Sequence, residues 1–110
     1  MLQERSVEDI VILAVPSYVS ADEIQGRVAE LLGNGQKQIA LDLTLLTFVE
    51  SSGLGTLVNA FKQIQGAGGQ FAMFSVQPYV QKLVDITKLG RILAIYESEG
   101  EAVSSLKASV

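Results

Sequence analysis

The sequence has no cysteine, no histidine and no tryptophan, and only two prolines among its 110 residues. Without cysteine, the chain can form neither a disulfide framework nor a thiolate nucleophile. Without histidine, it lacks the commonest general base and the commonest metal ligand of proteins. These absences exclude disulfide-stapled folds and remove the usual partner of a catalytic serine.

Long apolar runs and clusters of like charge are also missing. No stretch approaches the ~20 apolar residues that cross a bilayer, so we expect no membrane insertion. Residues 1–5 lack the charged-then-apolar layout of a signal peptide, which predicts a cytoplasmic protein. Eight Lys and Arg residues and twelve Asp and Glu residues are scattered along the chain. Their distribution predicts no metal site and no direct contact with nucleic acid.

What is present fits one domain spanning residues 1–110. Hydrophobic residues make up 48% of the chain, which is enough to form a packed core. Strand patterns alternate with helix patterns, so the sequence predicts a small α/β fold. An initial hairpin would make the sheet mixed but mostly parallel, packed against about four helices. We expect strands at residues 2–7, 10–15, 38–43, 70–76 and 92–96, and helices after Ser20, from Leu54, near Pro78 and after Ser98.

Helix boundaries are marked by capping residues and by glycines. Ser20 with Glu23, and Ser98 with Glu101, have the spacing of a capping box. Glycine-rich segments predict the ends of the first two helices, and Gly90 predicts the end of the third. Apolar periodicity predicts which side chains face the core. These are Ile24, Val28, Leu31 and Leu32; Leu54, Leu57, Val58, Phe61 and Ile64; Phe71, Met73 and Phe74; and Val80, Leu83, Val84 and Thr87.

The segment between the third predicted strand and the second helix is the most informative part of the chain. Residues 50–53 read Glu-Ser-Ser-Gly, which places two hydroxyls and a glycine at a helix N-terminus. That end carries free backbone N–H groups and the positive pole of the helix dipole. A serine there can cap the helix, or it can carry a phosphate in a favourable field. Both interpretations of Ser51 and Ser52 remain open at this point.

Two catalytic interpretations of the same segment find less support. Gly53 and Gly55 follow a strand and open a helix, as in a dinucleotide-binding loop, but Val58 replaces the third glycine of that motif. No Gly-Lys-Ser or Gly-Lys-Thr sequence occurs. A hydrolase could pair Ser51 with Asp42, although no histidine is available as its base. We therefore expect a protein that binds no cofactor and is not an enzyme.

Three blocks of sequence are specific when their order and spacing are taken together. They are residues 39–44 continuing to 48–55, the glycines at 68–69 with the strand at 71–74, and residues 78–83 continuing to 87–89. With these blocks the chain resembles the STAS domain family, in particular the bacterial anti-sigma factor antagonists. The resemblance covers residues 10–106, nearly the whole chain, and implies a single small STAS-like α/β domain.

The resemblance also implies a phosphorylation-switched binding module. In this family a partner kinase phosphorylates the hydroxyl after the acidic residue, which is Ser51 here. The unphosphorylated protein would sequester an anti-sigma factor serine kinase and release the sigma factor, and a PP2C-like phosphatase would reset it. The expected partner-binding residues are Glu50, Ser51, Ser52, Gly53 and Leu54. The alternative is a STAS-like accessory subunit of a lipid-transport or stress-sensing assembly, in which Ser51 is a structural helix cap.

The chain departs from the family pattern in two places. Glu50 occupies a position that is usually Asp, which keeps the charge but lengthens the side chain. After the second strand the family usually has a Gly-x-Leu-Asp turn, whereas this chain has Val-Pro-Ser-Tyr at residues 15–18. That turn lies near the phosphorylation loop in the family, so we expect the partner surface to differ here.

Overall fold

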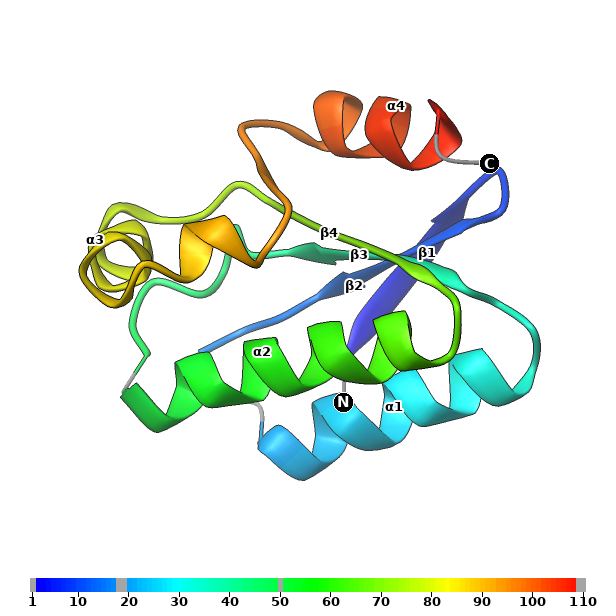
Figure 1. Cartoon of the computed structure of the whole chain (residues 1–110), viewed down its shortest axis with the longest axis horizontal. Coiled ribbons are helices and arrows are strands. Elements are labelled where there is room, and N and C mark those ends of the chain that lie inside the picture. The colour runs from blue at the N-terminus through cyan, green and yellow to red at the C-terminus, as the bar shows by residue number, and fades with distance from the viewer. Residues whose placement is uncertain (1, 18–19, 50, 109–110) are drawn as a thin grey trace.

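The computed structural model describes residues 2–17, 20–49 and 51–108, and within these ranges it has five strands and four α-helices. Strands and helices alternate after an initial hairpin, as the sequence predicted (Figure 1). The strands are β1 (Gln3–Val7), β2 (Ile10–Ala14), β3 (Gln38–Asp42), β4 (Gln70–Phe74) and β5 (Ile95–Tyr96). The helices are α1 (Ala21–Gly33), α2 (Ser51–Gly66), α3 (Pro78–Thr87) and α4 (Glu99–Ala108).

The strands form one sheet in the order β1-β2-β3-β4-β5. β1 and β2 make an antiparallel hairpin, and each later strand runs parallel to its neighbour. Leu13, Leu41 and Met73 are aligned across the three central strands. Each parallel connection contains a helix, as parallel strands require. The mixed, mostly parallel sheet predicted from the sequence is confirmed.

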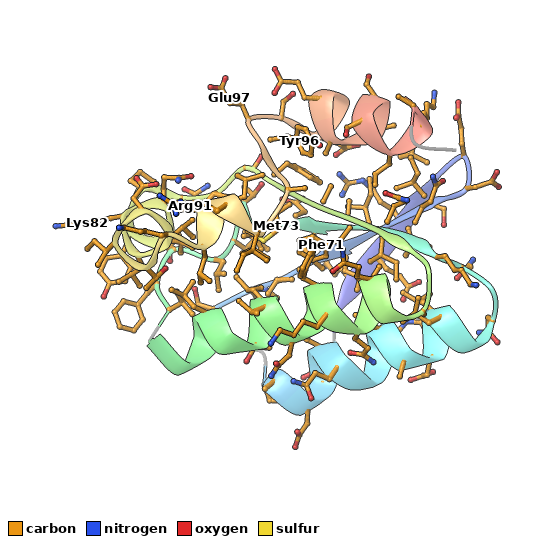
Figure 2. The ribbon with its side chains drawn as sticks, viewed as in Figure 1. Phe71, Met73, Lys82, Arg91, Tyr96 and Glu97 are labelled. Atoms are coloured by element: carbon orange, nitrogen blue, oxygen red, sulfur yellow. The ribbon has the colours of Figure 1, made fainter. Side chains whose placement is uncertain are left out.

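Helices cover both faces of the sheet, as Figure 1 shows. Helices α1 and α2 lie side by side against one face, where Met73 belongs to the larger apolar core. Helix α4 covers the opposite face, where Ala40 and Ala72 belong to a smaller apolar cluster. Figure 2 shows Phe71 between the sheet and α2, and Tyr96 on the side of α4. Successive strand residues enter different cores because their side chains point to opposite faces.

Both predicted capping serines are confirmed. The Ser20 hydroxyl accepts a hydrogen bond from the backbone N–H of Glu23 at 3.2 Å, at the start of α1. The Ser98 hydroxyl accepts one from the N–H of Glu101, also at 3.2 Å, at the start of α4. Pro78 occupies the first turn of α3, where its missing N–H leaves no helical hydrogen bond unmade.

The glycines after α2 are required by the local geometry. Gly68 has φ of +78°, in the left-handed region that favours glycine. A Cβ on Gly69 would lie only 2.4 Å from the carbonyl oxygen of Lys37. The Gly69 N–H donates to the carbonyl oxygen of Ile64 at 2.9 Å. The pair therefore ends α2 and brings the chain directly into β4.

Two helix boundaries differ from the prediction. Helix α2 begins at Ser51, three residues before the first core-facing residue, Leu54. Apolar periodicity does not reveal a turn made of two serines and a glycine. Helix α3 ends at Thr87 and not at Gly90, because Lys88 takes the left-handed conformation with φ of +59°. A single non-glycine residue can adopt this conformation at a cost of about 1–2 kcal/mol.

Strands β4 and β5 are shorter than predicted by more than one residue. In the last run only Ile95 and Tyr96 pair with β4, because residues 89–91 form a 3₁₀ turn just before it. Strand β4 ends at Phe74, since Ser75 takes φ of +56° and turns the chain toward α3. A local turn thus delays the start of β5 and ends β4, although the apolar run extends beyond each strand.

Most residues predicted to face the core are buried. Exceptions on the helices include Val58 and Phe61 of α2, which are half-buried, and Thr87 of α3, which is exposed. Phe61 still contacts Phe71 edge to face, with ring centroids 5.5 Å apart. Thr87 donates its hydroxyl to the carbonyl oxygen of Leu83 at 2.8 Å. That bond within the helix satisfies the hydroxyl without any contact with the core.

Candidate functional site

The candidate site lies where the chain passes from β3 into α2. Asp42, the last residue of β3, folds this connection into a turn. Its Oδ1 accepts hydrogen bonds from the backbone N–H and the hydroxyl of Thr44, at 3.0 and 2.6 Å. The N–H of Leu43 donates to the carbonyl oxygen of Phe74 at 3.1 Å, and Leu46 is buried in the core. The loop is therefore anchored at the carboxyl end of the parallel strands, where ligands bind in many α/β folds.

Helix α2 begins at Ser51, so both candidate hydroxyls belong to its first turn. Glu50 lies outside the described residues, and the side chains of Ser51 and Ser52 are not described either. In the sequence, Glu50 is the only charged residue between Asp42 and Lys62. The first turn of α2 contains no acidic residue. The helix thus presents the positive end of its dipole with no carboxylate inside its first turn.

Gly53 is held by close packing against the residues before the helix. A Cβ on Gly53 would lie 2.1 Å from Cγ2 of Val49. Val49 and Leu54 both join the larger core, at the two positions of a hydrophobic staple. We expected Leu54 to contact a partner, but its side chain is only 3% exposed. Leu54 therefore anchors the start of α2 in the core and is not part of the exposed surface. The missing side chain of Gly53 leaves room for Val49 to pack against the first turn of the helix.

Large apolar side chains are exposed beside this helix end. Leu45 and Phe48, in the loop before α2, are 56% and 54% exposed. Phe48 stacks on Tyr79 in the first turn of α3, with ring centroids 5.1 Å apart and planes at 27°. Tyr79 is itself 45% exposed. Exposed aromatic and apolar groups that gather in this way are typical of a surface that contacts another protein.

A pocket of about 400 Å³ separates the connection after β2 from the start of α2. The first turns of α2 form one wall with Gly53 and Thr56, and Ser17 lies in the opposite connection. The remaining lining is mostly apolar and includes Val15, Pro16, Ile24, Leu46, Phe48 and Val49. The pocket therefore adjoins both the exposed aromatic pair and the helix N-terminus.

The arrangement does not support a hydrolytic pair of Ser51 and Asp42. Alternation along β3 places the Asp42 side chain on the face that α4 covers, whereas α2 covers the other face. The Asp42 carboxylate is already bonded to Thr44 and lies 3.8 Å from the guanidinium of Arg5.

Within residues 2–17, 20–49 and 51–108, no three acidic, histidine or cysteine side chains gather as a metal site. Over the same ranges no helix is long and apolar enough to cross a membrane.

Two features of this surface were missed by sequence reasoning. One is the stacked pair of Phe48 and Tyr79. The other is Ser17, whose hydroxyl bonds to the loop before α2. Phe48 stands close to the Glu-Ser-Ser-Gly segment and Tyr79 follows a helix-starting proline. Neither signal indicates which aromatic residues meet, because that depends on how β3 and β4 align.

The family model of the STAS domain matches residues 4–102 of this chain. The match covers the sheet, helices α1 to α3 and the loop before α2. The chain therefore belongs to the STAS domain family, and the resemblance seen in the sequence is confirmed.

Known relatives agree with this assignment. The anti-sigma F factor antagonist of Paenibacillus polymyxa is 34% identical over 89 residues, which are 80% of this chain and 76% of that protein. The crystal structure of a candidate anti-sigma factor antagonist from Thermotoga maritima has a TM-score of 0.85 at 30% identity, and the match covers 96% of this chain and 94% of that one. Phosphorylated SpoIIAA from Bacillus has a TM-score of 0.70 at 17% identity, covering 96% and 98%. At that identity the likeness is one of fold alone.

Proposed function

We propose that this protein is an anti-sigma factor antagonist whose binding is switched by phosphorylation of Ser51. With Ser51 unmodified, it sequesters an anti-sigma factor serine kinase and so releases the sigma factor. With Ser51 phosphorylated, it no longer binds that kinase, and a PP2C-like phosphatase restores the binding form. In this role the protein is a bacterial cytoplasmic binding module and not an enzyme.

The proposal rests on the position of the first residue of α2. The helix starts at Ser51, beside an exposed stack of Phe48 and Tyr79 and in a segment whose only charge is Glu50. An apolar surface of this kind suits a protein partner, and a neutral hydroxyl at its edge can be converted into a dianion. A helix that used Ser51 only as a structural cap would not need the exposed aromatic pair beside it.

The relatives support the same role. Anti-sigma F factor antagonist is the name of the Paenibacillus polymyxa protein, which is 34% identical. Anti-sigma-B factor antagonist is the name of a Listeria monocytogenes protein that is 33% identical over 63 residues. SpoIIAA, which shares the fold, is known as a structure in both its phosphorylated and its unphosphorylated form. The names of the relatives support an antagonist role, and the two forms of SpoIIAA indicate that this fold accommodates a phosphate.

The free energies favour a local switch over a change of fold. A phosphate adds about −1.5 to −2 charges, which a helix N-terminus stabilises by about 0.3–2 kcal/mol. The same charge, held at an interface against a partner's acidic groups, costs several kcal/mol. Each 1.4 kcal/mol corresponds to a tenfold change in affinity. Phosphorylation would thus leave the domain folded while weakening its contact with the partner.

The direct test is phosphorylation in vitro by a candidate anti-sigma factor serine kinase from the same organism. The wild-type protein, Ser51→Ala and Ser52→Ala are each incubated with that kinase and ATP, and the modified residue is mapped by mass spectrometry. We expect phosphate on Ser51, none on Ser51→Ala and normal labelling of Ser52→Ala. Full labelling of Ser51→Ala would refute the assignment. Absence of labelling in all three would favour the accessory-subunit alternative, with Ser51 as a cap.

A further inference from the structure

Ser17 lies in the connection after β2, and its side chain is exposed. Its hydroxyl donates a hydrogen bond to the carbonyl oxygen of Leu45 at 3.3 Å. The same hydroxyl accepts one from the backbone N–H of Thr47 at 3.2 Å. One side chain therefore binds two backbone groups of the loop that leads into α2.

These two bonds have few equivalents in that loop. In the part of the chain that the structure describes, the other hydrogen bonds of residues 44–49 are local, from Thr44 to Asp42 and from Leu46 to Leu43. Side-chain packing of Leu46 and stacking of Phe48 add contacts but do not hold the backbone. Ser17 is thus the described residue that hydrogen-bonds this loop to a different segment.

The position of the loop matters for the helix end beyond it. Ser17, Phe48 and Gly53 all line the pocket of about 400 Å³, so the two connections and the first turn of α2 surround one space. Val49 follows in the chain and fits against Gly53 with no room for a Cβ. A shift of the loop would therefore move both Phe48, one member of the exposed aromatic pair, and the entry into α2.

We propose that Ser17 is a positioning residue, which holds residues 45–49 so that the partner kinase can reach Ser51. This inference rests on the function proposed above. A single hydroxyl can donate one hydrogen bond and accept another at the same time. Threonine has such a hydroxyl, and alanine has none.

The first arm of the test is independent of any partner. Amide exchange is measured by NMR on the full chain for the wild type, Ser17→Ala and Ser17→Thr. Ser104→Ala, an exposed serine on α4, is the matched control. We expect the Thr47 amide to exchange about threefold faster or more in Ser17→Ala. Exchange in β3 should not change, and Ser17→Thr and Ser104→Ala should match the wild type. Equal Thr47 exchange in Ser17→Ala and wild type would overturn the inference.

The second arm measures phosphorylation kinetics of the same proteins with ATP and the candidate anti-sigma factor kinase of the phosphorylation test above. We expect Ser17→Ala to lower kcat/KM at Ser51 by about threefold or more at an unchanged melting temperature, and Ser17→Thr to restore it. Wild-type kinetics in a Ser17→Ala protein with a loosened loop would also overturn the inference. A wild-type protein that this kinase neither binds nor phosphorylates would refute the proposed function. The exchange arm would then still show whether Ser17 holds residues 45–49 in place.

Discussion

At Gly53 two effects of a side chain oppose each other, which makes the position informative. Alanine is a better helix former than glycine by about 1 kcal/mol. The added Cβ would, however, lie 2.1 Å from Cγ2 of Val49, a branched side chain with little freedom to turn away. Two residues further on, a Cβ on Gly55 meets nothing within 4 Å. The helix therefore offers one crowded and one open glycine within a single turn.

We predict that Gly53→Ala lowers the free energy of unfolding by about 1–2 kcal/mol, because overpacking outweighs the gain in propensity. Gly55→Ala should raise it by up to about 1 kcal/mol. Urea denaturation of the two variants and the wild type checks both values. A Gly53→Ala protein as stable as Gly55→Ala would show that the chain before α2 does not run where the structure has it.

Among the elements, α2 packs on the sheet through apolar side chains, and two of those in the middle of the helix, Val58 and Phe61, are only partly buried. Phe61 is half-buried and contacts Phe71 edge to face. Phe61→Ala should therefore cost about 1.5–3 kcal/mol of unfolding free energy, less than a fully buried ring. Phe74, 2% exposed in the cluster under α4, is the comparison, and Phe74→Ala should cost about 3–5 kcal/mol. Denaturant melts in which Phe61→Ala costs under ~1 kcal/mol would contradict the packing of α2.

The edge strand β1 is tied to α1 by one ion pair. Arg27 donates from Nε to Oε1 of Glu4 at 2.5 Å and from Nη2 to Oε2 at 2.8 Å. The hydrogen bonds and charge of Arg27 lower the pKa of Glu4 below its usual value of 4.5, against an opposing effect of burial. The unfolded chain thus takes up this proton at a higher pH than the folded chain. The stabilisation is fully present above pH 4.5 and is lost as the pH falls through the lowered folded value.

We predict that Glu4→Gln is less stable than the wild type at pH 7, by no more than about 1 kcal/mol because the pair is partly exposed. The difference should shrink as the pH is lowered from 5 to 3. Urea denaturation of both proteins across this range provides the measurement. A difference that stays constant or grows on acidification would show that Glu4 is not held ionised by Arg27.

How far the sequence predicts these elements depends on what ends each one. Side-chain caps were predicted correctly at Ser20 and Ser98, because a capping box is a local pattern. The end of α3 at Thr87 was not predicted correctly, because nothing in the sequence indicates that Lys88 takes a left-handed conformation. The candidate segment was recognised from Glu-Ser-Ser-Gly, whereas the bonds of Ser17 to its loop depend on tertiary placement.

At the scale of the whole molecule, the two faces of the sheet are covered by different helices over separate apolar cores. Helix α4 and the smaller cluster close one face. The other face is covered by α1 and α2, and the loop before α2 brings Phe48 to Tyr79 of α3 at the carboxyl end of the strands. One end of the molecule thus carries the exposed aromatic pair, the pocket and the start of α2. A modification there can alter binding while the cores on both faces stay intact.

We propose that charge at Ser51, and not rearrangement of the fold, ends partner binding. The most direct measurement is the affinity of the stoichiometrically phosphorylated protein for the anti-sigma factor kinase, compared with the unmodified protein and with Ser51→Asp and Ser51→Ala. We predict that phosphorylation weakens binding at least tenfold, about 1.4 kcal/mol or more, at a nearly unchanged melting temperature. Ser51→Asp, with less charge, should show part of this loss, and Ser51→Ala should bind. Binding of the phosphorylated protein as tightly as the unmodified one would contradict the account.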